Sequence, residues 1–178
     1  CGAMLMLMLG VAIGERSSAV VNGFCFIVLL LAGAALSSVP AGTHAMFGGS
    51  FIVDDYARFL KLLTLVGSGG ALLLSLDYLT VENQQKFEYG TLVLLSTLGM
   101  LMLISASDLI ALYLGLELMS LPLYVIAASN RENIKSTEAG LKYFVLGARS
   151  SGMVLYGASL IYGFTGTVNF AGIAKATQ

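Results

Sequence analysis

Long apolar runs separated by short polar segments make up most of this chain. The run between Glu88 and Asp108, for example, contains no Lys, Arg, Asp or Glu. Crossing the hydrocarbon core of a bilayer takes about 20 mostly apolar residues in a helix. Runs of this length and spacing therefore predict an all-α protein, a polytopic transmembrane helix bundle.

Six helices can be placed from this pattern within one transmembrane domain spanning residues 1–178. They are expected at about residues 3–14, 20–36, 54–79, 89–105, 109–128 and 138–164. Residues 37–53 contain Ser, Pro and Gly and predict a loop outside the membrane that can include a hairpin. Asp54 and Asp108 precede apolar runs, where a carboxylate can cap a helix. After Thr165 we expect a loop or a surface helix.

Composition supports a membrane protein and excludes several other classes. Hydrophobic residues make up 57% of the chain and charged residues 11%, where a soluble domain carries roughly a quarter charged. A net charge of −1 gives no reason to expect nucleic acid as a partner. The two cysteines, Cys1 and Cys25, are too few and too far apart for a metal site.

Two other features have plain structural interpretations. The sequence Gly67-Ser68-Gly69-Gly70 lies within an apolar run and lacks the following Lys-Ser/Thr of a phosphate loop, which favours close helix packing. Asp54, Arg58 and Lys61 are spaced to lie on one helical face, which predicts an ion-paired entrance to the third helix.

The basic residues predict an orientation. One set of loops holds Arg16, Lys86, Arg131 and Lys135, whereas the other side has Lys175 and, near a helix entrance, Arg58 and Lys61. By the positive-inside rule the first set is cytoplasmic. We also expect an internal piece of a longer protein, because the chain opens inside a membrane helix and stops without a cap.

Glu117 is the main candidate for chemistry, because it lies near the middle of the fifth predicted helix. A charge at that depth costs at least about 2.5 kcal/mol, so the carboxyl needs a partner, a proton or water. It can be a neutral acid that hydrogen-bonds helices together, or part of a proton or ion pathway. Pro122 predicts a bend just beyond it, since proline cannot donate to the carbonyl of Leu118.

Lys142 and Arg149 lie on one face of the sixth predicted helix. The Lys142 ammonium can reach back to the headgroups, in which case it has no further role, or it can take part in charge transfer. Arg149 cannot deprotonate at working pH, so it can bias a proton relay without carrying the proton. It can equally face headgroups or another subunit.

The second half of the chain strongly resembles the membrane subunit N family of bacterial respiratory complex I, the proton-pumping NADH–quinone oxidoreductase. The matching runs are Asp-Leu-Ile-Ala-Leu-Tyr-Leu-Gly-Leu-Glu-Leu-Met-Ser-Leu-Pro-Leu-Tyr (108–124), Ser-Thr-Glu-Ala-Gly-Leu-Lys-Tyr-Phe-Val-Leu-Gly-Ala (136–148) and Leu-Tyr-Gly-Ala-Ser-Leu-Ile-Tyr-Gly-Phe-Thr-Gly-Thr (155–167). The front half matches less tightly, with a similar helix count and the run Phe-Ile-Val-Asp-Asp-Tyr-Ala-Arg-Phe (51–59).

The resemblance implies the N-terminal part of an antiporter-like subunit in the bacterial cytoplasmic membrane. It implies that Glu117 and Lys142 form part of a proton half-channel that follows quinone reduction elsewhere. The family pattern offers no basic role for Arg149. It implies no cofactor on this chain, with flavin and iron–sulfur clusters on partner subunits. The expected neighbours are subunits K and M and membrane lipid, with quinone involved only indirectly.

Two other functions remain open. A subunit of a multisubunit sodium/proton antiporter would share this fold, although the run Glu-Ala-Gly-Leu-Lys-Tyr-Phe (138–144) favours subunit N. A purely structural membrane spacer would need no proton chemistry at Glu117.

Overall fold

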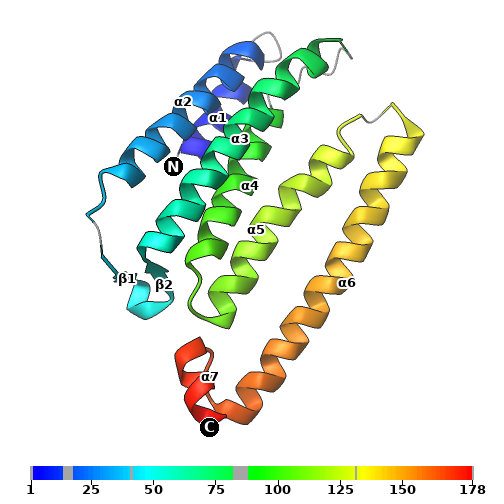
Figure 1. The fold of residues 1–178 in the computed structure, drawn as a ribbon. Helices are drawn as coiled ribbons and strands as arrows, with labels where there is room; N and C mark the ends of the chain where they lie inside the picture. The colour runs from blue at the N-terminus through cyan, green and yellow to red at the C-terminus, as the bar shows by residue number, and fades with distance from the viewer. Residues whose placement is uncertain (1, 14–17, 41, 82–87, 131, 178) are drawn as a thin grey trace.

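The computed structural model of the chain describes residues 2–13, 18–40, 42–81, 88–130 and 132–177. Helices dominate these ranges, and a two-stranded hairpin interrupts them (Figure 1). The elements are α1 (Gly2–Ile13), α2 (Ser18–Ser37), β1 (His44–Met46), the 3-10 turn η2 (Phe47–Gly49), β2 (Phe51–Val53), α3 (Asp55–Val81), α4 (Glu88–Ser105), α5 (Leu109–Ala127), α6 (Ile134–Thr165) and α7 (Phe170–Ala176).

Most of the predicted elements are present. The hairpin in the loop after α2 is confirmed, with Ala45 paired to Ile52 in antiparallel register. Both predicted caps are confirmed as well. The Asp54 carboxylate accepts the backbone N–H of Ala57 at 2.7 Å, and the Asp108 carboxylate accepts that of Ala111 at 2.6 Å.

The start of the sixth helix was predicted too late. Residues 129–137 looked like one polar loop, but α6 begins at Ile134 rather than at residue 138. The Asn133 side chain caps it by accepting the backbone N–H of Lys135 at 3.0 Å. The first turn of α6 is thus polar and still helical, because a helix can continue beyond the apolar part of its sequence. The expected surface helix after Thr165 is present as α7.

The hairpin, the α4–α5 turn and the α6–α7 turn meet at one end of the bundle (Figure 1). The backbone N–H of Ser107 donates to Ser50 O at 2.8 Å, and that of Leu109 donates to Val168 O at 3.0 Å. These bonds join three connections that are far apart in sequence. They fix the end of the bundle at which α5 begins.

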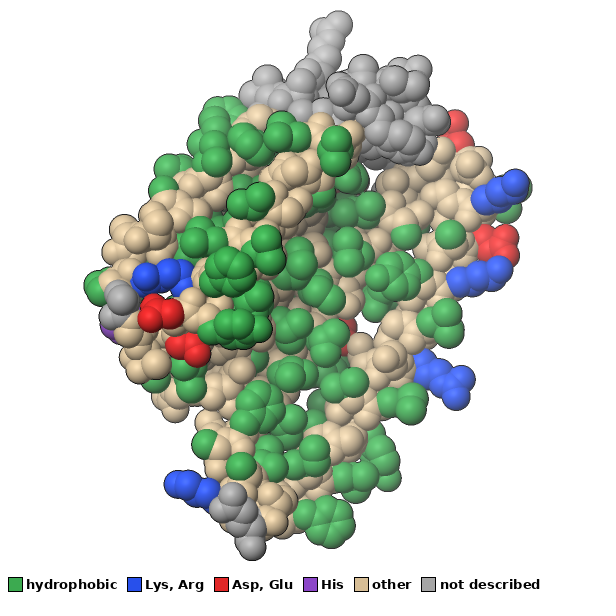
Figure 2. All heavy atoms as spheres, in the orientation of Figure 1, with side chains coloured by type: hydrophobic (Ala, Val, Ile, Leu, Met, Phe, Trp, Pro, Cys, Tyr) green, Lys and Arg blue, Asp and Glu red, His purple; other side chains and the backbone are tan. Residues whose placement is uncertain are grey.

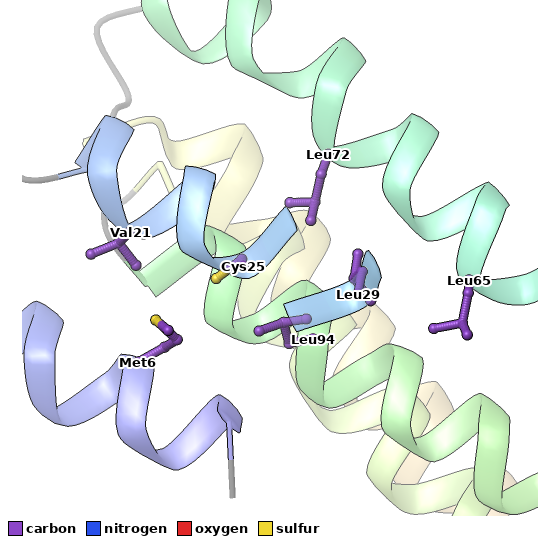
Figure 3. Close-up of a cluster of buried hydrophobic side chains, with 7 residues drawn as sticks. All are labelled: Met6, Val21, Cys25, Leu29, Leu65, Leu72 and Leu94. Carbon is purple, nitrogen blue, oxygen red and sulfur yellow. The ribbon is translucent and has the colours of Figure 1, made fainter. Parts of the chain in front are cut away.

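The hydrophobic core lies among the first four helices. Cys25, Leu29, Leu65, Leu72 and Leu94 are buried there together with Met6 and Val21, and their side chains converge from α1, α2, α3 and α4 (Figure 3). Cys25 is fully buried, as expected for a small apolar side chain.

Glycines bring α4 and α5 close together. A Cβ added at Gly99 would lie 2.7 Å from the carbonyl carbon of Leu118, and one at Gly115 would lie 2.9 Å from the backbone nitrogen of Leu103. Both distances are shorter than ordinary contacts between non-bonded carbon atoms, which are about 3.5–4.0 Å. The glycines therefore set the spacing of this helix pair, as small residues do in membrane bundles.

Two packing predictions require correction. The Gly67–Gly70 run of α3 packs closely against other helices only in part. Ser68 forms a hydrogen bond with Thr97, and Gly69 faces Phe26. A Cβ added at Gly67 or Gly70, by contrast, would meet nothing within 4 Å.

The ion-paired entrance to α3 is not formed among the described residues. Instead the Arg58 guanidinium donates to the carbonyls of Val39 and Pro40, which follow α2, while Asp54 is engaged as the cap.

Four described helical segments are long and apolar enough to cross a membrane: Asp55–Ser75, Glu88–Ser105, Leu109–Ala127 and Ile134–Thr165. Val21–Ser37 is a shorter apolar segment. Large hydrophobic side chains are exposed over much of the face seen in Figure 2. The outer surface of this bundle therefore suits lipid or neighbouring helices rather than water.

Candidate functional site

Glu117 lies in the middle of α5, among apolar residues, as the sequence predicts. The residue is half-buried, and its Oε1 atom is buried with no hydrogen-bond partner among the described residues. A buried carboxyl oxygen without a partner is unfavourable unless it is protonated or meets water or another group. Oε1 of Glu117 is thus available to a proton, a water molecule or a neighbouring group.

Pro122 is buried within α5, one turn beyond Glu117. It has no N–H for the carbonyl of Leu118, so the helix has a free acceptor at this level. The neighbouring Met119 carbonyl accepts the Ser96 hydroxyl of α4 at 3.0 Å. Met119 lies on the α4 side of α5, so this bond joins α4 to α5 at about the level of Glu117.

Lys142 pairs with a residue of its own helix. Its Nζ lies 2.5 Å from Oε1 of Glu138, one turn earlier on α6, and both side chains are more than half exposed. An exposed i, i+4 pair of this kind contributes only about 0.3–0.5 kcal/mol. The structure leaves the Lys142 ammonium at the surface of the described bundle and does not bring it to Glu117.

The helix register gives the separation of these two residues. Gly140 of α6 lies level with Ala128, because a Cβ at Gly140 would be 3.0 Å from the Ala128 Cα. The helices run antiparallel, so Lys142 is level with about residue 126, nine residues from Glu117. At 1.5 Å per residue the two differ in depth by about 14 Å. The two side chains are too far apart for a direct contact, so water molecules or other side chains would have to link them.

Arg149 is exposed on α6, and among the described residues it forms no ion pair. Basic side chains project along the outer edge of α6 in Figure 2. The predicted pairing of this face with headgroups or with another subunit is compatible with that exposure.

The face of α5 that carries Glu117 is turned toward α6. Tyr113 and Tyr124 lie four residues before and seven residues after Glu117, on the same helical face. The Tyr124 ring packs edge-on against Tyr143, with ring centroids 4.7 Å apart. Tyr113 lines a cavity of about 490 Å³ between α5 and α6, together with Ser159 and other residues. Along α5, Glu117 therefore lies between the Tyr124–Tyr143 ring contact and the cavity lined by Tyr113.

Sequence reasoning missed a second set of buried polar groups. Asn22 Oδ1, Thr91 Oγ1 and Ser105 Oγ are buried without partners among the described residues. Thr97 and Ser68, by contrast, satisfy each other through a hydroxyl–hydroxyl bond of 2.9 Å. The signal available in the sequence was a few small polar residues scattered along the apolar runs, which does not reveal whether each one faces lipid or a neighbouring helix.

The described residues contain no group of three or more His, Cys, Asp or Glu that could hold a metal ion. Glu117 is the ionisable residue within α5, and a carboxyl at that depth needs a partner, a proton or water.

Residues 106–178 match a protein family described as NADH:quinone oxidoreductase/Mrp antiporter, transmembrane. The chain is 60% identical to the NADH-quinone oxidoreductase subunit N of Azorhizobium caulinodans over 97% of its own length and 36% of the relative. It is 51% identical to subunit N 1 of Rhizobium meliloti over 98% of its length and 36% of the relative. The chain thus spans little more than a third of these relatives.

Solved structures share the fold. Respiratory complex I from Thermus thermophilus contains a chain that superposes with a TM-score of 0.77 at 32% identity, over 94% of this chain and 36% of that one. A membrane-bound sulfane sulfur reductase, an archaeal respiratory membrane complex, superposes with a TM-score of 0.76 at 26% identity, over 97% of this chain and 39% of that one. The resemblance found in the sequence is thereby confirmed: this membrane chain is similar, over nearly all of its length, to subunit N of bacterial NADH-quinone oxidoreductases.

Proposed function

We propose that this chain is part of a proton-translocating membrane subunit of an NADH–quinone oxidoreductase in the bacterial cytoplasmic membrane. The observation that supports the proposal most strongly is the buried, unpartnered Oε1 of Glu117 in the middle of α5. A structural acid would be expected to use its buried oxygens in hydrogen bonds between helices. An acid that takes up and releases a proton needs an oxygen that is free to change partners.

In this proposal Glu117 is the buried proton-binding residue of a half-channel. Pro122 leaves a free carbonyl beside it that can hold a water molecule. The redox chemistry takes place on partner subunits that carry flavin and iron–sulfur clusters. Quinone acts on this chain only indirectly, and subunits K and M are the proposed neighbours.

Lys142 is proposed as the second proton-binding residue of the half-channel, nearer the cytoplasm. Because about 14 Å of depth separates it from Glu117, water or further side chains must link the two. The Glu138 contact is weak enough to be exchanged, so Lys142 can swing away from it as the charge of the relay changes. Arg149, seven residues further along α6, raises the local positive potential without carrying a proton.

The test is proton translocation per NADH oxidised by the assembled complex in membrane vesicles, with assembly checked on native gels. Glu117→Gln should assemble and lose most of the translocation, while Glu117→Asp should keep part of it. The control is Glu132→Gln, which removes an exposed carboxylate near the α5–α6 connection and should leave the ratio unchanged. Normal pumping by assembled Glu117→Gln would reduce Glu117 to a packing residue and overturn the proposal.

Lys142→Met should also lower the translocation ratio. If Glu117 and Lys142 act as one unit, the double variant should be no worse than the poorer single variant. Losses that simply multiply would show that the two residues act independently.

A sodium/proton antiporter subunit is the alternative, because the matching family description also names the Mrp antiporter. Purification of the native assembly decides between them: flavin and iron–sulfur subunits should copurify with this chain. Their absence from an intact assembly would favour the antiporter.

A further inference from the structure

A groove runs between α2 and α3 on the outside of the bundle, away from Glu117. It has a volume of about 560 Å³, and its walls are apolar, with Phe26, Leu30 and Ala34 on one side and Leu62, Val66 and Leu73 on the other. Ser37 is the polar residue at one end, and its hydroxyl already donates to Ala34 O at 2.8 Å. The groove itself therefore suits a purely apolar occupant.

The length of the groove matches one leaflet of a bilayer. Its lining residues on α3 extend from Leu62 to Leu73, which is about 16 Å at 1.5 Å per residue. The hydrocarbon core of a membrane is about 30 Å thick. A single acyl chain that enters at the Leu62 end would follow the groove to near the middle of the membrane.

The Leu62 end of the groove carries positive charge. Lys61 directly precedes Leu62, is half-buried, and forms no ion pair among the described residues. Arg58 lies one turn before Leu62, where its guanidinium donates to the Pro40 carbonyl at 2.7 Å and to the Val39 carbonyl. A guanidinium has five donors, so others remain for an incoming anion.

The acidic groups of this region lie farther from the groove. Asp54 and Asp55 occupy the start of α3, two turns before Leu62, and the Asp54 carboxylate is engaged with the backbone N–H of Ala57. Acidic and basic side chains gather at this end of the molecule in Figure 2. The charge nearest the groove is thus positive, and Lys61 has no acidic partner among the described residues.

We propose that the α2–α3 groove binds a phospholipid with a negatively charged headgroup, with one acyl chain between Leu30 and Val66 and the phosphate beside Lys61 and Arg58. A basic residue near the membrane surface contributes about 1 kcal/mol of attraction to anionic lipid, equal to about a fivefold change in affinity. The site does not depend on the proposed proton transfer.

The test uses phospholipids that carry a photoreactive diazirine in the acyl chain, with the assembled complex in nanodiscs. Phosphatidylglycerol, attracted by both Lys61 and Arg58, should crosslink to residues 26–37 and 62–73 about 25 times more than phosphatidylcholine at equal concentration. Lys61→Gln should lower phosphatidylglycerol crosslinking about fivefold, while Lys175→Gln, an exposed lysine on α7, should not.

A second pair of variants tests the groove itself. Gly70 lines it and a Cβ there would meet nothing within 4 Å, so Gly70→Phe should fill the groove without disturbing the bundle and abolish crosslinking of both lipids. Gly67→Phe is the matched control on the same helix, with equally open space and no place in the groove lining. Crosslinking that survives Gly70→Phe, or equal labelling of wild type by both lipids, would overturn the proposal. So would a protein segment that covers the groove and prevents labelling.

Discussion

Replacing Gly99 by alanine tests whether the close approach of α4 and α5 holds this part of the bundle together. The added Cβ would lie 2.7 Å from both the Leu118 carbonyl carbon and the Met119 Cα. Ordinary contact between such carbon atoms begins near 3.5 Å, and the Met119 backbone nitrogen is closer still, so the two helices must separate by at least about 0.8 Å or bend. The atoms in the way are backbone atoms, which cannot rotate aside as a side chain can.

The expected cost follows from two opposing effects. Overpacking of a well-packed core costs about 1–3 kcal/mol, and contact with the backbone of Leu118 and Met119 favours the upper end. Alanine regains about 1 kcal/mol of helix propensity relative to glycine. The Gly99→Ala variant should therefore lose about 2 kcal/mol of unfolding free energy, a factor of about 30 in the folding equilibrium.

The assay is unfolding of the chain in mixed micelles by increasing mole fraction of dodecyl sulfate, followed by circular dichroism. The matched control is Gly67→Ala, on a helix face where a Cβ meets nothing within 4 Å, and it should be unchanged or slightly stabilised. If Gly99→Ala is as stable as Gly67→Ala, the glycine contacts do not set the α4–α5 spacing.

Three further predictions concern topology, capping and the exposed ion pair. Cysteines placed at Lys135 and His44 should label from opposite sides of the membrane, with Lys135 on the cytoplasmic side; labelling of both from one side would refute the antiparallel arrangement. Asp108→Ala should lower the unfolding free energy by about 0.5–2 kcal/mol, because it removes the cap of α5, whereas an unchanged dodecyl sulfate midpoint would contradict the capping role. Glu138→Gln should change that free energy by no more than about 0.5 kcal/mol, since its contact with Lys142 is exposed, and a larger loss in the same titration would show a buried pair.

Much of the fold could be predicted because the membrane restricts what an apolar run can form. Asp54 and Asp108 marked the starts of α3 and α5 through a local rule, and the Ser, Pro and Gly residues of 37–53 marked the loop that holds the hairpin. The start of α6 was missed because Asn133 was one of several polar residues in a row, any of which could have been the cap. Local signals therefore predict the end of a helix accurately only where a polar segment gives way abruptly to an apolar one.

The candidate site was harder to predict, because it depends on how helices face one another. Glu117 could be found from sequence as a single acid in an apolar run. The separation of Glu117 from Lys142 could not be predicted, since the difference in depth follows from the register of α5 and α6 at Gly140 and Ala128. The burial of the Asn22 oxygen could not be predicted either, because a polar residue in an apolar helix can face either a neighbouring helix or the lipid.

The protonation of Glu117 itself can be measured most directly by infrared difference spectroscopy of the assembled complex as NADH reduces quinone. Proton exchange at Glu117 predicts a carboxyl band that changes during turnover, shifts in heavy water, disappears in Glu117→Gln and persists in Glu132→Gln. Difference spectra of Glu117→Gln that match those of the wild type would show that this carboxyl does not exchange a proton during turnover, and would contradict the proposed role of Glu117.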